Sequence, residues 1–393
     1  MRIFSDKLIM TPGPTEVPER IRLSMIRRTT NPDLDPEFMR IYRETIEMIN
    51  RLIGVHRSST ETFVMIGEAM LGLESAIANI ISERDKVIVV ANGVFGEGFA
   101  DLVKSYGGEP VLVAEDENSW RRSIDLSTLE RVLEKNRDAV AMTLVHCDTP
   151  SALLNDLEAV AKLAREFGVL LIVDAVSTIG ATPIRFDDLG IDVLIGGSQK
   201  ALNAPAGMTI ISVSERAWER IERKRYSGYY MNLLLWRDYV RKGIFPYTMS
   251  EPLIYSLNEA LKLLLEEGLD NVYKRHLVAR EASWRAAEAL GLELYPAEIK
   301  CSCPTVTAFL PPKGLSERSI RDIMWNRYGV MIAGSWGRLE GRVLRIGHMG
   351  VQASKDLLMR TYVALANTLR DLGMNVSIQT VVSVIESSYE KHQ

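Results

Sequence analysis

The chain has 393 residues, of which 47% are hydrophobic and 25% charged, as is typical of a soluble globular protein large enough for two domains. Its net charge of −4 argues against nucleic-acid binding. The first residues form no apolar signal region and no run approaches the roughly 20 apolar residues of a membrane span, so we expect a cytoplasmic protein that does not associate with membranes.

Short apolar runs and helical stretches alternate along the first two thirds of the chain. Residues 1–18 are proline-rich and predict an extended segment, and residues 19–55 predict a helix that is interrupted at 31–36. The predicted strands are 63–66, 87–90, 111–113, 139–145, 169–173, 193–195 and 208–212, and the helices between them include 68–81, one that ends near 105, and 157–167. This alternation predicts an α/β fold with a parallel sheet and right-handed crossovers.

The helix predicted at 157–167 has apolar residues at a spacing that buries one face. We expect Asn155 and Glu158 to cap its start and Gly168 to end it. Beyond about residue 267, helices near 271–290 and 353–372 flank short runs at 305–310 and 343–346, and the last twenty residues predict a terminal helix. The sequence therefore predicts three parts, which are an N-terminal segment (1–18), a large domain (19–267) and a small α+β domain (268–393).

The spacing of the three cysteines matches no common type of cysteine site. Cys301 and Cys303 are two positions apart and Cys147 is remote, which suits neither a disulfide framework nor a four-ligand zinc site. We therefore expect reduced thiols and no metal site.

Unusual residues gather where the predicted strands end, namely Gly67, Phe95, Thr149, Asp174 and Lys200. In open α/β sheets, ligands bind beyond the carboxyl ends of the strands. We therefore expect these residues to face one crevice.

Lys200 and Asp174 carry the strongest chemical signal. Lys200 follows a buried strand and two glycines within an otherwise uncharged stretch, and a desolvated lysine has a lowered pKa, so its neutral amine can form an imine with an aldehyde or ketone. Asp174 ends the preceding apolar strand. The pair suits pyridoxal 5′-phosphate (PLP), because the carboxylate can keep the pyridine nitrogen protonated while the lysine carries the aldehyde carbon as a Schiff base.

The motifs around these two residues resemble a known family. V-D-A-V-S at 173–177 and G-S-Q-K-A-L-N-A-P-A-G at 197–207 look like the class V aminotransferases of PLP fold type I, most closely the alanine:glyoxylate and serine:pyruvate aminotransferases. The resemblance extends from T-P-G-P-T at 11–15 to R-I-G-H-M-G at 345–350. It implies a large PLP-binding domain with a mainly parallel sheet, followed by a smaller α+β domain.

The resemblance implies a role for each matching residue. Lys200 would move the substrate proton as general base and then acid, and Asp174 would pair with the ring nitrogen. Arg345 would bind the substrate carboxylate through its two parallel donors, beneath the N-terminal segment that contains Gly13. The remaining cofactor contacts would be Phe95 stacked on the ring, Val176 on its opposite face, Thr149 near the ring oxygen and the substrate, and Gln199 at the phosphate.

The phosphate site is also expected to involve a second subunit. In the family, the residue matching Thr248 reaches the phosphate of the neighbouring subunit, which implies an obligate homodimer with shared active sites. The aromatic phosphate ligand of close relatives falls at Phe245, which has no hydroxyl. We expect Tyr247 to substitute for it.

The loop that would hold the phosphate departs from the family pattern. Relatives have G-S-G-T or G-S-G-H at the helix start, whereas this chain has G-E-A-M at 67–70. A glutamate facing a phosphate dianion would be repulsive. We expect the amides of Ala69 and Met70 to bind the phosphate, and Glu68 to turn away or to pair with a cation.

These features together predict a PLP-dependent transaminase that moves an amino group from alanine or serine to glyoxylate or pyruvate. The alternatives within the family are a transaminase for ureidoglycine or an aminophosphonate, and a cysteine desulfurase or lyase, which is disfavoured because Gln199 stands where desulfurases usually have a histidine. A nucleotide-binding dehydrogenase would need a G-x-G-x-x-G turn, which the chain lacks. A non-catalytic subunit that keeps the fold is the last alternative.

Overall fold

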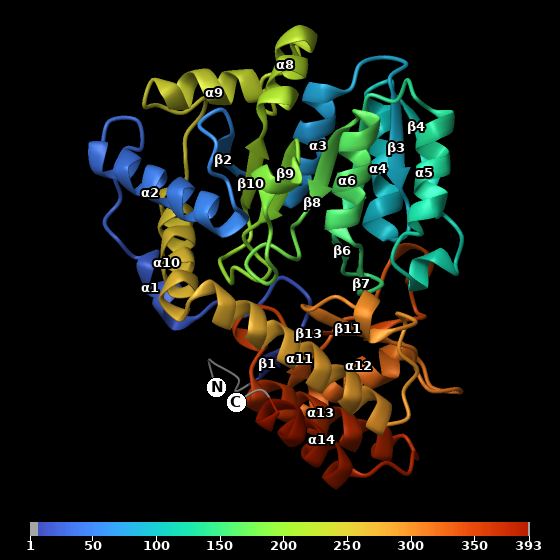
Figure 1. Ribbon diagram of the computed structural model, residues 1–393. Helices are drawn as coiled ribbons and strands as arrows, with labels where there is room; N and C mark the ends of the chain where they lie inside the picture. The colour runs from blue at the N-terminus through green and yellow to red at the C-terminus, as the bar shows by residue number, and fades with distance from the viewer. Residues whose placement is uncertain (1–6, 392–393) are drawn as a thin grey trace.

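The computed structural model describes residues 7–391, and a seven-stranded sheet forms its upper part (Figure 1). The strand order is β2-β10-β9-β8-β5-β3-β4. The bounds are β2 (Glu61–Ile66), β3 (Lys86–Val90), β4 (Glu109–Val113), β5 (Ala141–Val145), β8 (Leu170–Asp174), β9 (Val193–Gly197) and β10 (Met208–Val213). The predicted, mainly parallel sheet is thus confirmed. Only β10 runs antiparallel to its neighbours, because the turn at 198–207 is too short for the crossover that a parallel strand requires.

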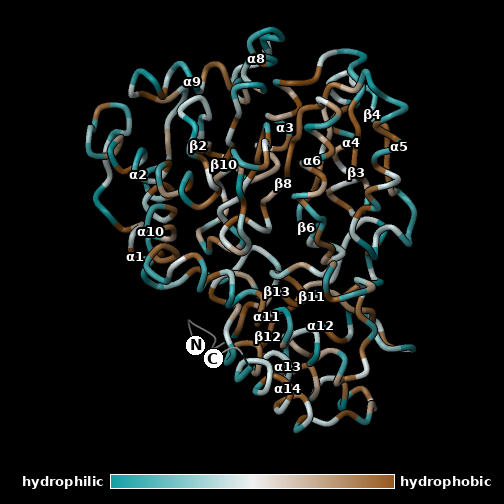
Figure 2. Tube along the Cα trace, viewed as in Figure 1, coloured by the Kyte–Doolittle hydropathy of each residue, from teal (hydrophilic) through white to brown (hydrophobic). Residues whose placement is uncertain are grey.

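Helices pack against the sheet and bury its apolar strands. They are α2 (Pro36–Ile53), α3 (Ala69–Ile80), α4 (Val94–Ser105), α5 (Leu126–Lys135), α6 (Leu157–Phe167), α7 (Phe186–Leu189) and α8 (Glu215–Lys224). α3 packs on β9 and β10, α4 on β3, and α6 on β8. In Figure 2 the strand β8 is brown and lies inside, whereas the outer ends of the connections are mostly teal. The helices leave the ends of the strands as the place where polar side chains meet.

The helix α6 has the bounds that its spacing predicts, but its cap differs from the prediction. Asp156 is the N-cap and its carboxylate accepts the amide of Ala159 at 3.0 Å. Asn155 is instead buried, and its side-chain oxygen accepts a hydrogen bond from the side-chain amide of Asn92 at 2.7 Å. Gly168 ends the helix with φ of 71°, as predicted.

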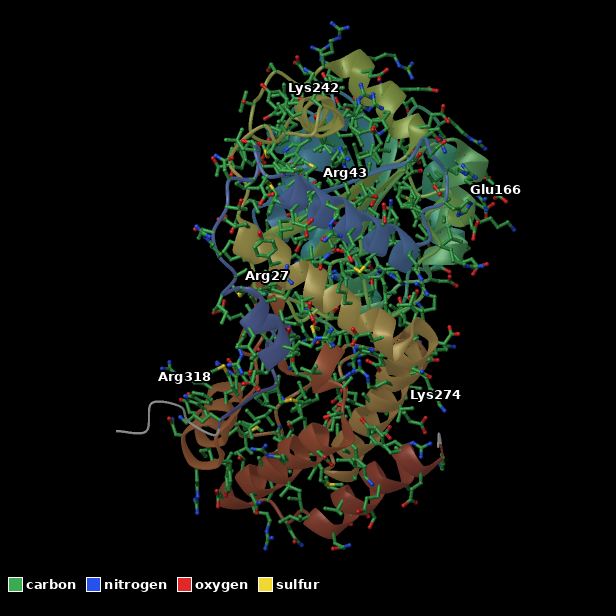
Figure 3. All side chains as sticks on the ribbon, turned by 90° about the vertical axis from the view of Figure 1, so that its left-hand side faces the viewer. Arg27, Arg43, Glu166, Lys242, Lys274 and Arg318 are labelled. Carbon is green, nitrogen blue, oxygen red and sulfur yellow. A yellow bond between two sulfur atoms is a disulfide. The ribbon has the colours of Figure 1, made fainter. Side chains whose placement is uncertain are left out.

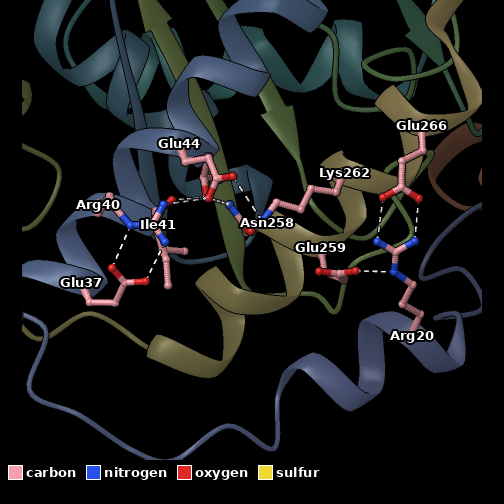
Figure 4. Close-up of polar contacts among 10 residues, drawn as sticks. Arg20, Glu37, Arg40, Ile41, Glu44, Asn258, Glu259, Lys262 and Glu266 are labelled. Atoms are coloured by element: carbon pink, nitrogen blue, oxygen red, sulfur yellow. Dashed lines mark hydrogen bonds and ion pairs between the residues drawn. The ribbon is translucent and has the colours of Figure 1, made fainter.

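Two N-terminal helices pack on a long helix at the edge of the sheet. The N-terminal helices are α1 (Glu19–Ser24) and α2, and the long helix is α10 (Glu251–Glu267). The helix α9 (Leu233–Arg241) precedes α10 in the chain. Arg20 of α1 pairs with both Glu259 and Glu266 of α10, and Glu44 of α2 pairs with Lys262 at 3.2 Å (Figure 4). The interruption predicted at 31–36 therefore separates two helices that dock on one partner.

The lower part of Figure 1 is a smaller α+β unit with its own hydrophobic cluster. It contains α11 (Leu269–Ala289), α12 (Glu317–Tyr328), α13 (Lys355–Asp371) and α14 (Ile378–Glu390), with the antiparallel pair β11 (Val306–Phe309) and β13 (Leu344–Gly347). The helix predicted near the end of the chain is α14, which packs on α11 and α13. Because α11 contributes Val272 to the larger core and Ala279 to the smaller one, the boundary at residue 268 stays a prediction.

The N-terminal segment joins the two parts. The sequence predicts no strand there, yet β1 (Leu8–Ile9) pairs in parallel with β12 (Val330–Met331) of the smaller unit. Further along the segment, the Thr15 hydroxyl donates to the carbonyl of Lys200 at 3.1 Å. The predicted irregular path thus holds for most of the segment, while residues 1–6 lie outside the described residues.

Cys147 and Cys303 form a disulfide, so the prediction of three reduced thiols is wrong for these two. Cys147 lies in β6 (Cys147–Asp148), which pairs with β7 (Leu153–Leu154), and Cys303 lies just before β11. The fold brings their Cα atoms to 5.9 Å although 156 positions separate them, which spacing alone does not reveal. Cys301 keeps a free, buried thiol.

Removing this disulfide is expected to lower the thermal stability. A cross-link that closes so long a loop typically stabilises a fold by about 2–4 kcal/mol, which for a chain of this length corresponds to a Tm decrease of roughly 3–5 °C. Calorimetry of Cys303→Ser measures the decrease, and Cys301→Ser, two positions away, is the control with an unchanged Tm. Equal Tm values for all three proteins in the absence of reductant would contradict a bridge in solution.

The outer surface carries charges of both signs. The labelled side chains in Figure 3 point to solvent from different helices and loops: Arg27, Arg43, Glu166, Lys242, Lys274 and Arg318. Within residues 7–391, none of the helices combines the length and the apolar character that crossing a membrane requires.

Candidate active site

A cavity of about 400 Å³ opens at one edge of the sheet, lined in part by residues at or after the ends of β2, β3, β8 and β9. β2 and β9 both run antiparallel to β10, so β2 points in the same direction as β3, β5, β8 and β9. Nine of the predicted site residues line this cavity: Gly13, Glu68, Ala69, Met70, Phe95, Asp174, Val176, Gln199 and Lys200. The structure therefore brings most of the predicted set together.

Lys200 lies in the turn between β9 and β10, and its amine faces the N-terminal segment. The Nζ atom donates to the carbonyl of Pro12 at 2.6 Å. Burial and, to a lesser extent, the nearby charge of Arg345 lower the pKa of Lys200 from 10.5 to about 8, against the opposite effect of Asp174 and Glu68. A substantial fraction of the amine is therefore neutral and nucleophilic near physiological pH.

The cofactor-free protein is expected to react with an aromatic aldehyde at Lys200 with a rate that rises as the pH increases through about 8. The reason is that only the neutral amine attacks a carbonyl, and its fraction grows as the pH passes the pKa. Borohydride trapping at a series of pH values, followed by mass spectrometry of the labelled peptide, measures the profile. A lysine in a model peptide, which titrates near 10.4, provides the reference, and a midpoint there for Lys200 would contradict the lowered pKa.

Asp174 ends β8 and is 5% exposed. Its Oδ1 accepts the amide of Val176 at 2.9 Å, and no described residue donates to Oδ2. Burial, together with the nearby charge of Asp148, raises the pKa of Asp174 to about 7. A buried carboxylate with a free oxygen can be stabilised by a cationic donor such as a protonated pyridine.

Two further polar side chains near the cavity have atoms without partners. The Thr149 hydroxyl is buried and makes no hydrogen bond within the described residues, although Thr149 does not line the cavity itself. The side-chain oxygen of Gln199 is likewise buried without a partner. Of these two atoms, the Gln199 oxygen belongs to a residue that lines the cavity, so a ligand bound there could complete its hydrogen bonding.

The backbone at Gly13 lies so close to Lys200 that a side chain at this position would collide with it. The φ of Gly13 is 94°, and a Cβ at this position would lie 2.8 Å from Nζ of Lys200. The glycine therefore lets the N-terminal segment lie across the lysine, as the sequence predicts.

Glu68 does not take the position expected of it. Its carboxylate caps α3 and accepts the amide of Met70 at 2.9 Å, so it neither turns away from the helix start nor pairs with a described cation. The physical reason is that a side-chain acceptor at the N-cap satisfies a free amide and interacts favourably with the helix dipole. The Met70 amide, which we expected to bind a phosphate, is thus already occupied by an anionic group.

Arg345 lies on β13 and is 6% exposed, but no ion pair holds it within residues 7–391. Its Nε donates to the carbonyl of Gly334 at 2.6 Å, which leaves the two terminal nitrogens free. Burial lowers the pKa of Arg345 to about 10. The residue lines a second cavity of about 450 Å³ beside the first, and a buried arginine without a carboxylate partner is suited to bind an anionic substrate.

Tyr247 and Thr248 lie away from the cavity of their own chain. The Tyr247 hydroxyl accepts from the Trp236 indole at 3.1 Å and donates to the carbonyl of Tyr230 at 3.3 Å, and Thr248 is exposed. Phe245 is buried and packs edge-on against Tyr42, so it belongs to the core. The predicted contacts of Tyr247 and Thr248 with a partner's phosphate stay predictions.

Two residues of this region, Trp336 and Asp148, were not among those predicted. Trp336 lines both cavities. The feature of the sequence that could have indicated it is a bulky aromatic residue in the stretch G-S-W-G at 334–337, shortly before Arg345. Asp148 is buried and accepts the amide of Phe95 at 2.9 Å, which fixes the start of α4 and thereby the Phe95 ring. Its signal was a carboxylate directly before Thr149 at the end of a predicted strand.

These residues fit PLP at the ring and at the aldehyde. The free oxygen of Asp174 and the unpaired side-chain oxygen of Gln199 would be available for the predicted ring and phosphate contacts, and Lys200 would supply an amine. The contact predicted for Thr149 stays a prediction. At the phosphate end, the cofactor would have to share the start of α3 with the Glu68 carboxylate.

Comparisons with known proteins show similarity over almost the whole chain. The sequence model of the family described as aminotransferase class-V matches residues 13–334. The pyridoxamine–pyruvate transaminase of Mesorhizobium japonicum is 32% identical over 97% of both chains, and the serine–glyoxylate aminotransferase of Methylorubrum extorquens is 33% identical over 96% of this chain and 95% of its own. The crystal structure of the ureidoglycine–glyoxylate aminotransferase of Bacillus subtilis has a TM-score of 0.90 at 29% identity and covers 99% of this chain and 100% of its own.

Proposed function

The chain belongs to the class V aminotransferases, which are PLP-dependent transaminases, and from this we propose that it moves an amino group from alanine or serine to glyoxylate or pyruvate. The observation that carries the proposal is the pair of an amine and a carboxylate, Lys200 and Asp174, in one cavity beside the unpaired guanidinium of Arg345. An α-amino acid offers the two groups that this arrangement requires, an amine and a carboxylate.

The bound cofactor supplies an aldehyde that accepts the amino group and a protonated ring that withdraws electrons from the substrate Cα. Asp174 would hold the proton on the ring nitrogen, because a buried carboxylate is most stable beside a cation. Lys200, with its lowered pKa, would remove the proton from the substrate Cα and later return it. Arg345 would bind the substrate carboxylate and thereby fix the orientation of Cα toward the lysine.

We also propose a homodimer with shared active sites. Supporting it are large apolar side chains that remain exposed in the single chain: Leu23, Ile26, Leu34, Met70, Tyr229 and Tyr230. Met70 among them lines the cavity, and Thr248 is exposed and free to reach another subunit. Light scattering coupled to size-exclusion chromatography measures the mass, and a mass of about 44 kDa, that of one chain, would contradict the dimer.

The catalytic proposal is tested with the purified protein. We expect a visible absorption band that borohydride removes while it attaches the cofactor to Lys200. A survey of amino donors with glyoxylate as acceptor should then show turnover of alanine or serine above that of larger amino acids. Absence of turnover with every amino acid tested would contradict the proposed donor class.

A second candidate function follows from the position of Glu68. A carboxylate at the start of α3 opposes a phosphate, whereas a ring without a phosphate leaves it undisturbed. Pyridoxamine, the amino donor named for one of the relatives, is such a molecule. In this reaction pyridoxamine would give its amino group to pyruvate, so that pyridoxal and alanine are formed, and Lys200 would again act at the carbon that carries the nitrogen.

Replacing Glu68 by serine is expected to separate the two candidates. Serine still caps the helix, so the variant removes only the charge. If the carboxylate opposes the phosphate, PLP binds at least tenfold more tightly to Glu68→Ser, a difference of about 1.4 kcal/mol, while the affinity for pyridoxal changes less than threefold. Fluorescence titration of both molecules with both proteins measures the four dissociation constants. Weaker PLP binding to the variant would show that the carboxylate supports the phosphate and would count against pyridoxamine as donor.

A further inference from the structure

Trp336 stands between the two cavities of the site. It lies in the loop between β12 and β13, and it lines both the cavity of Lys200 and the cavity of Arg345. Its ring meets the Phe95 ring edge to face at 5.7 Å, and the Arg345 guanidinium lies 5.4 Å from its centroid. Any molecule that contacts both Lys200 and Arg345 therefore passes the indole.

The loop that carries Trp336 is fixed by contacts that do not involve the indole. The Ser335 hydroxyl donates to the carbonyl of Pro150 at 3.0 Å, and Arg338 forms an ion pair with Glu97. Trp336 itself is 49% exposed, and no hydrogen bond from its indole nitrogen is found within residues 7–391. The indole therefore presents a large apolar surface to whatever enters the two cavities.

We propose that Trp336 is a specificity-determining residue that restricts the side chain of the amino donor to a few atoms. This inference rests on the proposed function, in which the donor is fixed at two points, its amine at the cofactor aldehyde beside Lys200 and its carboxylate at Arg345. The side chain of the donor then projects from Cα toward the indole of Trp336, which lines both cavities. A small side chain fits against the indole, and a longer one collides with it or displaces the carboxylate from Arg345.

The test compares donors of increasing length, namely alanine, 2-aminobutyrate and norvaline, with glyoxylate as acceptor. A methylene that a pocket does not accommodate typically reduces kcat/KM by about 10-fold or more. We expect the ratio of kcat/KM for norvaline to that for alanine to rise at least tenfold in Trp336→Ala, and less in Trp336→Phe, while the activity toward alanine remains measurable. Trp325→Ala is the matched control, because Trp325 lines only the Arg345 cavity, and its ratio should stay within threefold of the wild-type value.

The outcomes separate this inference from the proposed function. A ratio in Trp336→Ala within threefold of the wild-type value, with alanine still turned over, overturns the role of Trp336 alone. No turnover of any amino acid by the wild-type protein contradicts the proposed function and the inference with it. An equal rise of the ratio in Trp325→Ala shows a general loosening of the smaller unit and also overturns the inference.

Discussion

Replacing Lys200 with alanine is expected to reduce kcat/KM for transamination by about 10³-fold or more. The variant loses both the amine that forms a covalent bond with the cofactor and the base that moves the substrate proton, and proton transfer by a positioned side chain alone contributes about 10²- to 10⁴-fold. Initial rates with alanine and glyoxylate measure the loss. Borohydride should no longer attach the cofactor to the chain, although the cofactor can still bind through its other contacts.

Lys162→Ala provides the control for this prediction, because Lys162 lies on the exposed side of α6 and, among residues 7–391, forms an ion pair with Glu166 alone, at 3.8 Å. Its activity should equal that of the wild type. A Lys200→Ala variant that keeps more than a tenth of the wild-type rate would show that another group carries the chemistry.

Replacing Arg345 with lysine is expected to reduce kcat/KM for amino acids by roughly 100-fold or more while the cofactor absorbance stays unchanged. Removing one partner of a buried, hydrogen-bonded charge pair usually costs about 2–5 kcal/mol, and lysine cannot present two parallel donors to a carboxylate. Steady-state kinetics with several amino acids, together with the visible spectrum, measure both quantities. The loss should affect all α-amino acids alike, because all of them carry the carboxylate.

Arg321 offers a matched control, since it lines the same cavity as Arg345 but is already bound to Glu317 through two hydrogen bonds. Arg321→Lys should change kcat/KM less than threefold. If Arg321→Lys lost the activity and Arg345→Lys kept it, the carboxylate would bind to Arg321. A loss of cofactor absorbance in Arg345→Lys would indicate a structural role for the residue.

Much of the fold was predictable because the local signals agree with one another. The strands that bear Asp174 and Lys200 are continuous apolar runs, and α6 has both a buried face and a terminal glycine, so its bounds were correct. The antiparallel direction of β10 was missed, since it depends on the length of the turn at 198–207 and not on the composition of the strand. The short strand β1 was missed because its partner lies in the other part of the molecule.

The site was predictable to the extent that its residues follow directly after strands. Asp174 and Lys200 share a cavity because parallel strands end at one edge of the sheet, which is a property of the fold class. The conformation of Glu68 was not predictable, because a carboxylate at a helix start can either accept a free backbone amide or remain in solvent. The sequence alone does not distinguish these two conformations. The pairing of Cys147 with Cys303 likewise depends on how the two parts dock.

The pairing of β1 with β12 also determines when a working site exists while the protein is being made. Leu8 aligns with Val330, so a nascent chain that stops before α12 contains Lys200 but lacks the strand that anchors the segment at Pro12. Until residues near 330 have left the ribosome and folded, the segment is held at Thr15 but not at β1, so we expect the contact between the Pro12 carbonyl and the lysine amine to be incomplete. Incomplete copies of the chain are therefore expected to be inert toward amino acids, even when they contain the entire seven-stranded sheet.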